Sequence, residues 1–145
     1  AIIEYVAELF PDAGIWPKDR AARAEARAIS MEMLSGFRAL RSTCPMNIRR
    51  TPGRIALPDG VMGDVMRIET IWKDALARSG GPFLYGGFSA ADAMYAPVVN
   101  RFEAYCLTED EAVLTYMARM KAHPAWRKWQ AAAVAEPWIV PEDEV

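Results

Sequence analysis

The stretch Phe88-Ser-Ala-Ala-Asp-Ala-Met-Tyr-Ala-Pro-Val-Val-Asn-Arg-Phe-Glu103 decides the fold of this chain. Ser89 and Asp92 have the spacing of a capping box, in which each side chain bonds the backbone N–H of the other residue. The helix that follows carries apolar side chains at intervals of three and four residues, namely Ala91, Met94, Val98, Phe102 and Tyr105. A face of this kind is buried against other helices. The stretch therefore predicts a capped core helix, and we expect Ser89 and Asp92 to be structural rather than catalytic.

Helical patterns account for most of the remaining chain. The first ten residues have apolar positions at helical spacing, and Asp19 is a suitable N-cap for a long helix that we expect to run to about Thr43. Asp59 is expected to open the next helix, and Thr108 with Glu111 to cap a later one. No segment shows the sustained alternation and β-branched enrichment of a strand. The sequence therefore predicts an all-α helical bundle of five or six helices.

The composition is that of an ordinary globular domain. The 145 residues are 52% hydrophobic and 25% charged, with a net charge of −2, which gives no argument for nucleic acid as a partner. No apolar run has the length of a membrane helix, so we expect no membrane partner and a cytoplasmic protein. The two distant cysteines, Cys44 and Cys106, are expected to be reduced thiols. The one histidine, His123, precedes Pro124 and is expected to mark a helix boundary, so we expect no metal site.

The positive charge is concentrated in one part of the chain. Eight arginines but only two acids, Glu25 and Glu32, lie from Arg20 to Arg54. Such a face is a solvated helix surface or a source of ion pairs in most proteins, and a site that attracts anionic ligands in others. The sequence leaves both interpretations open.

The first predicted helix has no capping residue at its start. No Ser, Thr, Asp or Asn precedes its apolar positions, and the chain does not open on methionine, whereas helices usually begin at a cap. We therefore expect the chain to be part of a longer protein. Residues 1–11 would end an upstream domain, residues 12–18 would form a linker of turn residues, and residues 19–145 would form the helical domain.

The capped helix, with Gly81-Pro-Phe-Leu-Tyr-Gly86 before it, resembles the central helix of the C-terminal domain of cytosolic, proteobacterial-type glutathione transferases. Further blocks in the same order extend the resemblance over nearly the whole chain: Ala1–Glu8, Ile15–Pro17, Arg27–Arg50 and Trp126–Trp138. The resemblance implies that a thioredoxin-like N-terminal domain precedes this helical domain and binds most of the glutathione. It also implies a homodimer.

The same resemblance suggests roles for particular residues. It places the group that stabilises the glutathione thiolate in the N-terminal domain, so no catalytic residue is expected in this chain. The helical domain would supply one wall of the site for a small hydrophobic electrophile. The positive charges of Arg38 and Arg41 suit a carboxylate of glutathione or of the substrate. The apolar candidates are also explained by ordinary contacts in the core or in a dimer. The substrate-binding candidates are Met31, Leu34, Ser35, Arg38 and Trp138.

Three functions are compatible with these expectations. In the preferred one, the full-length protein conjugates glutathione to a small hydrophobic electrophile, and the helical domain alone is inactive. In the second, the fold is a non-catalytic protein-interaction module whose binding face includes Arg23 and Arg27. In the third, glutathione is a cofactor in the isomerisation of a maleyl-type acid, whose carboxylates the arginines hold.

Overall fold

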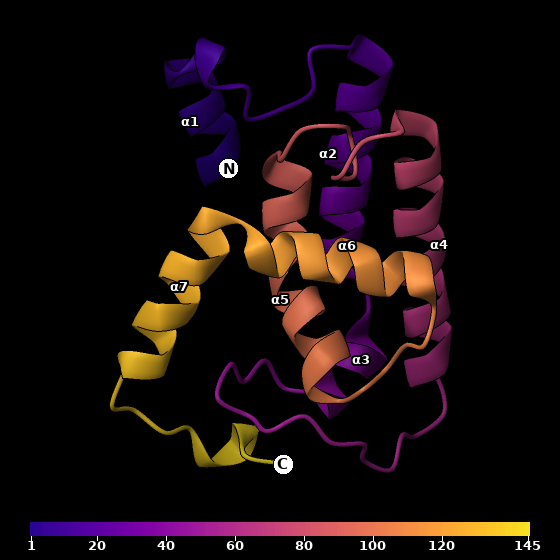
Figure 1. Ribbon diagram of the computed structural model, residues 1–145, viewed down its shortest axis with the longest axis vertical. Helices are drawn as coiled ribbons and strands as arrows, with labels where there is room; N and C mark the ends of the chain where they lie inside the picture. Colours follow the sequence, from indigo (N-terminus) through magenta and orange to yellow (C-terminus); the bar gives the residue numbers. More distant parts are fainter.

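Seven α-helices make up the fold in the computed structural model, which describes residues 1–145 (Figure 1). They are α1 (Ile2–Leu9), α2 (Arg20–Ser35), α3 (Arg38–Thr43), α4 (Val61–Ser79), α5 (Ala90–Ala104), α6 (Glu111–Ala122) and α7 (Pro124–Ala135). Two short 3₁₀ turns, η1 (Pro11–Ala13) and η2 (Pro141–Asp143), lie near the ends of the chain. Strand-like pairing is limited to two isolated bridges within residues 83–87. The prediction of an all-α bundle is confirmed, although the helix count exceeds the predicted five or six.

Helix α5 is the central helix of the bundle. It packs against α2 and α6, and α6 also contacts α4 and α7. Figure 1 shows α2, α4 and α5 running along the long axis of the molecule, with α6 crossing them. Because several helices surround α5, its buried residues lie around most of its circumference rather than on one stripe; they include Ala91, Tyr95, Val98, Val99 and Phe102.

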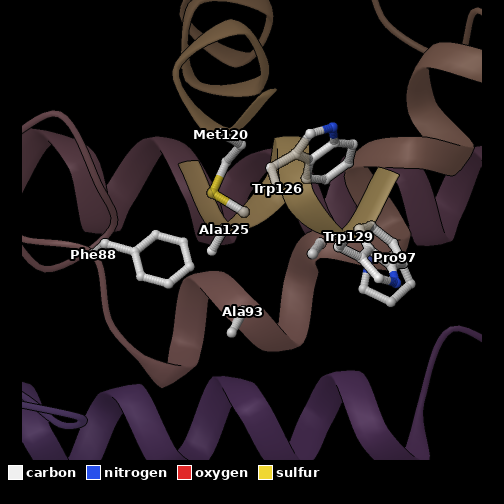
Figure 2. A pocket seen from close by; sticks show the side chains of 8 residues that line it. Phe88, Ala93, Pro97, Met120, Ala125, Trp126 and Trp129 are labelled. Atoms are coloured by element: carbon white, nitrogen blue, oxygen red, sulfur yellow. The ribbon is translucent and has the colours of Figure 1, made fainter. Parts of the chain in front are cut away.

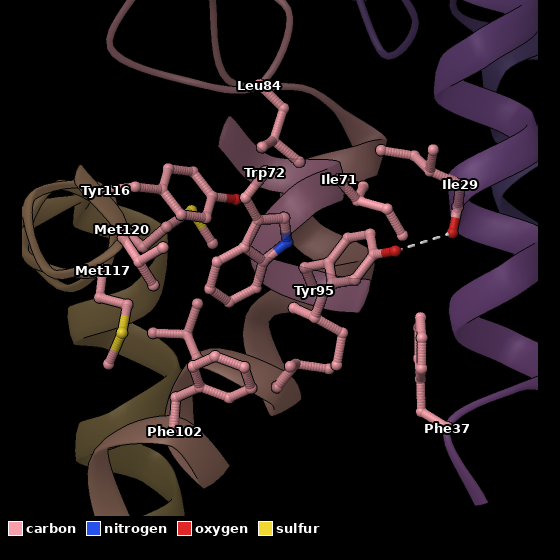
Figure 3. Close-up of a cluster of buried hydrophobic side chains, with 14 of the residues drawn as sticks. Ile29, Phe37, Ile71, Trp72, Leu84, Tyr95, Phe102, Tyr116, Met117 and Met120 are labelled. Carbon is pink, nitrogen blue, oxygen red and sulfur yellow. Dashed lines mark hydrogen bonds between the residues drawn. The ribbon is translucent and has the colours of Figure 1, made fainter. Parts of the chain in front are cut away.

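The core is organised around the indole of Trp72 in α4, which is fully buried. Its ring centroid lies 5.6 Å from that of Tyr95, 5.2 Å from that of Phe102 and 5.0 Å from that of Tyr116 (Figure 3). Aromatic rings at these separations stabilise the fold by more than the burial of their apolar area alone would give. The Tyr95 hydroxyl also donates to the Ile29 carbonyl at 3.1 Å. This cluster therefore joins α2, α4, α5 and α6.

The predicted long helix from Asp19 to about Thr43 is wrong in its second half. Asp19 does cap α2, since its carboxylate accepts from the Ala22 N–H at 2.8 Å, but α2 ends at Ser35. Phe37 has a left-handed backbone conformation, with φ of 53°, and its side chain is buried. A new helix, α3, starts after it, and Asp64 of α4 accepts from the Leu40 N–H at 2.9 Å. This cap comes from a distant helix, so the local sequence does not reveal it.

Two predicted caps are also wrong. Helix α4 begins after Gly60, which has φ of 96°, rather than at Asp59. Helix α6 is capped by Asp110, whose carboxylate accepts from two backbone N–H groups of the first turn, so the predicted box of Thr108 and Glu111 does not form. Thr108 instead donates its hydroxyl to Glu69 of α4. In both cases the helix begins one or more residues away from the predicted position, and only α6 has a side-chain cap.

The start of α5 has the geometry of a capping box. Ser89 is the N-cap and Asp92 the third helical residue, with both reciprocal bonds present. The fully buried Asp92 carboxylate accepts from the backbone N–H of Ser89 at 2.9 Å and of Leu84 at 3.1 Å, and also from the hydroxyls of Ser89 and Tyr116. Burial raises the pKa of Asp92, and these hydrogen bonds oppose the rise.

Candidate functional site

Three of the five predicted substrate-binding residues lie together where α2 gives way to α3. Leu34 and Ser35 are the last residues of α2, and Arg38 is the first of α3. They border an open hollow of about 680 Å³. Its complete lining is Leu34, Ser35, Arg38, Arg41, Ser42 and Arg101. The hollow therefore combines one apolar side chain, two hydroxyls and three guanidinium groups.

The break at Gly36 and Phe37 creates this arrangement. Because Phe37 is buried in the core, the last turn of α2 and the first turn of α3 border the same open hollow. Arg41 Nη1 donates to the Leu34 carbonyl at 2.8 Å, which satisfies one of the free carbonyls at the end of α2. A continuous helix would have placed Leu34 and Arg41 two turns apart.

Two residues of this hollow, Ser42 and Arg101, are not among the residues that the sequence indicated, and Arg101 is the charged one. It belongs to the last turn of α5, and its side chain is partly buried. Its Nε donates to the Cys44 carbonyl at 2.8 Å, across the end of α3. Burial lowers the pKa of Arg101, and the charge of Arg41 lowers it further. No local motif marks Arg101, because its approach to α3 depends on how α5 packs.

The other two predicted residues lie elsewhere. Met31, one turn before Ser35, is 51% exposed and does not line the hollow. Trp138 borders a separate hollow of about 310 Å³ between residues 46–49, α7 and the C-terminal tail. Arg49 donates to the Trp138 and Glu136 carbonyls and so holds this tail in place. The structure therefore does not gather the five candidates into one site.

An apolar pocket of about 240 Å³ lies between α5 and α7 (Figure 2). Seven of the eight residues that line it are hydrophobic, and they include Phe88, Met120, Trp126 and Trp129. Figure 2 shows Trp126 and Trp129 on α7, Met120 at the end of α6 and Phe88 on the segment that leads into α5. Trp126 and Trp129 lie three residues apart on α7 and both line this pocket.

The histidine His123 and the thiol of Cys44 both have a structural role. His123 caps α7, accepting from the Ala125 N–H at Nδ1, and its ring stacks on Phe88 at 4.0 Å between centroids. Cys44 is buried, and burial raises the pKa of its thiol, which disfavours the reactive thiolate. No three residues among His, Cys, Asp and Glu are grouped so that they could hold a metal ion.

The apolar surface of α1 is unusual for a helix at the edge of a bundle. None of its residues is buried, and the exposed ones include Ile2, Tyr5 and Leu9. It is attached to α2 by a bidentate pair, in which Arg27 donates to both oxygens of Glu4 at 2.9 Å. A groove of about 330 Å³ separates α1 from Phe88 and the start of α5.

Comparison with known protein families covers most of the chain. The family model described as "Glutathione S-transferase, C-terminal domain" matches residues 20–132, from the start of α2 into α7. No curated protein gives a significant match to the sequence. Among the helices, none combines the length and the apolar character needed to cross a membrane.

Proposed function

We propose that this chain, which belongs to the glutathione S-transferase C-terminal domain family, is the helical half of a glutathione transferase and supplies one wall of the electrophile site. The observation that carries this proposal is the hollow at the α2–α3 break, where Leu34, Ser35 and Arg38 face one open space. An apolar side chain beside cationic ones suits an electrophile that has both an apolar body and a polar group.

A thioredoxin-like domain is the proposed partner of α1. The exposed apolar residues of this helix form a surface of the kind that packs against another domain. The groove beside it, between Ile3 and Phe88, offers further apolar contact. In this arrangement residues 1–11 complete the upstream domain, residues 12–18 are the linker and residues 19–145 are the helical domain.

The chemical roles divide between the two domains. Conjugation needs glutathione as its thiolate, which requires a hydrogen-bond donor or a positive dipole beside the sulfur. We assign that role, and most of the binding of glutathione, to the thioredoxin-like domain. The residues of this chain bind and orient the electrophile: Leu34 contacts its apolar part, and Arg38 attracts its negative or polar part. The complete enzyme is proposed to be a cytoplasmic homodimer that acts on small hydrophobic electrophiles.

The full-length protein tests this proposal. It should be retained on immobilised glutathione and should conjugate a chlorodinitrobenzene, whereas the helical chain alone should do neither. Replacing Leu34 by Gln should raise the KM for the electrophile by roughly tenfold, because Leu34 is exposed and covering such a side chain with an apolar ligand contributes about 1–2 kcal/mol. Leu114→Gln is the matched control, since Leu114 is exposed on α6 and lies outside the hollow. A full-length protein without affinity for glutathione would exclude the proposal.

The two alternative functions are unequally supported. A protein-interaction face built on Arg23 and Arg27 is disfavoured, because Arg27 is paired with Glu4 and Arg23 donates to the Pro17 and Lys18 carbonyls. Isomerisation of a maleyl-type acid gains support from the guanidinium groups around the hollow. Turnover without net consumption of glutathione would distinguish isomerisation from conjugation.

A further inference from the structure

The guanidinium groups around the α2–α3 hollow have no carboxylate partner within the chain. The six ion pairs of the structure engage other cations, namely Arg27, Arg54, Arg67, Lys73, Arg78 and Lys121. No acidic side chain lines the hollow, although three arginines do. Unpaired arginines are common on protein surfaces, but here Arg38, Arg41 and Arg101 come from two helices of the bundle and converge on one space.

The hydrogen-bond donors of these arginines are largely unused. Each guanidinium has five N–H groups. Arg38 donates to no group of the protein, and Arg41 donates one hydrogen bond, to the Leu34 carbonyl. Arg101 bonds the Cys44 and Pro97 carbonyls through Nε and Nη1, which leaves Nη2 free. The two serines are different, since Ser35 and Ser42 donate their hydroxyls to carbonyls one turn earlier. The arginines are therefore the donors that the hollow offers to a ligand.

We propose that this hollow binds a carboxylate and that it gives the transferase a preference for electrophiles that carry one. The inference rests on the proposed function, and it assigns Arg41 and Arg101 to the site together with Arg38. Planar guanidinium groups bind carboxylates through paired, charge-assisted hydrogen bonds. Leu34, on the same rim, would contact the apolar body of the ligand next to its charged group.

The electrostatics of Arg101 agree with this assignment. Burial and the neighbouring charge of Arg41 both lower the pKa of Arg101, so two cations beside the hollow repel each other. An anion between them would relieve this repulsion. Tyr105, Cys44 and, least of the three, Asp143 of the C-terminal tail act on Arg101 in the opposite direction, and none of them lines the hollow.

A pair of matched probes tests the preference. The full-length protein is titrated calorimetrically with a naphthalene carboxylate and with the corresponding carboxamide, which has the same ring system but no charge. The carboxylate should bind at least tenfold more tightly. The double variant Arg38→Gln/Arg41→Gln should lose about tenfold or more in carboxylate affinity and much less in carboxamide affinity, because the carboxamide is polar but carries no charge. Both substitutions are at exposed positions, so the fold should survive them.

Arg119→Gln is the control variant. Arg119 is exposed on α6, outside the hollow, so its replacement should leave both affinities unchanged. Equal binding of the two probes would overturn the inference, as would a loss in Arg119→Gln as large as that in the double variant. The retention of wild-type protein on immobilised glutathione is measured in parallel. If the protein is retained on glutathione but binds both probes equally, the carboxylate site is excluded and the proposed function is not. If the protein binds the carboxylate more tightly but is not retained on glutathione, the proposed function is excluded and the carboxylate site is not.

A second measurement identifies which reactant carries the carboxylate. The KM for glutathione is determined with a chlorodinitrobenzene, which has no carboxylate, in wild type and in the double variant. An unchanged KM supports a carboxylate on the electrophile. A KM raised tenfold would assign the hollow to a carboxylate of glutathione and overturn the preference for acidic electrophiles.

Discussion

The Tyr116 hydroxyl donates to Asp92 Oδ1 at 3.1 Å and ties the middle of α6 to the first turn of α5. The same carboxylate accepts from the Leu84 N–H, so it also fixes the turn that precedes the helix. One buried side chain thus connects the turn before α5, the first turn of α5 and the middle of α6. A simple helix cap would have been confined to its own first turn.

Replacing Asp92 by Ala should destabilise the fold by about 3 kcal/mol or more. The substitution leaves the N–H groups of Leu84 and Ser89 and the hydroxyl of Tyr116 buried without an acceptor, and each such loss costs about 1–3 kcal/mol. Urea unfolding gives the free energy. Tyr116→Phe, which removes one donor and no acceptor, should cost about 1 kcal/mol. Equal losses in the two variants would contradict this central role of Asp92.

The carboxyl group of Asp92 should make the free energy of unfolding depend on pH in an unusual way. Burial raises the pKa of Asp92 in the folded chain above its ordinary value of 3.8, so the folded state holds the proton more tightly than the unfolded state. The part of the stability that depends on protonation of Asp92 is therefore fully present below pH 3.8 and is lost as the pH rises through the folded pKa. Asp92→Asn removes the titration. The free energy of unfolding of wild type relative to this variant should fall across that window, and a flat or rising difference would show that the pKa is not raised.

Two glycines provide a matched test of the break between α2 and α3. A Cβ on Gly36 would lie 2.7 Å from the Glu32 carbonyl oxygen, so Gly36→Ala should destabilise the chain by about 1–3 kcal/mol. Gly63, in the first turn of α4, has no atom within 4 Å of a Cβ, and Gly63→Ala should stabilise it by about 0.5–1 kcal/mol. Thermal unfolding of both variants measures the difference. A stabilising Gly36→Ala would mean that α2 continues beyond Ser35.

The sequence predicts those features of the fold that depend on neighbouring residues. The periodic apolar faces, the Asp19 cap and the absence of strands all follow from local patterns, and the structure confirms them. The break at Gly36 and Phe37 does not follow from such patterns. It is stabilised by the burial of Phe37 and by the Leu40 N–H to Asp64 bond, which spans 24 residues. Tertiary contacts of this kind override helix propensity.

The candidate site shows the same division between local and distant information. Leu34, Ser35 and Arg38 are close in sequence, and the structure brings them to one hollow. Trp138 lies beside the segment 46–49, because the path of the C-terminal tail depends on contacts made by Arg49. Arg101 was missed because only the packing of α5 brings it near α3. Residue type and spacing therefore identified part of the hollow but not its full set of charges.

Arg49 should control the order of the C-terminal tail with little effect on global stability. Its guanidinium donates to the Glu136 carbonyl at 2.8 Å and also to the Trp138 carbonyl, whereas the side chain of Trp138 is 69% exposed and provides little anchoring. A glutamine at this position is too short and has too few donors to make both bonds. Arg49→Gln should therefore change the free energy of unfolding by less than about 1 kcal/mol, because the contacts are exposed. Chymotrypsin should cleave this variant after Trp138 several-fold faster than wild type, because the tail is no longer held.

Arg54→Gln is the control variant. It removes an exposed pair with Glu109 from the same segment, and Arg54 makes no contact with the tail. Equal cleavage rates in the two variants would show that the tail is held by its apolar side chains instead of by Arg49.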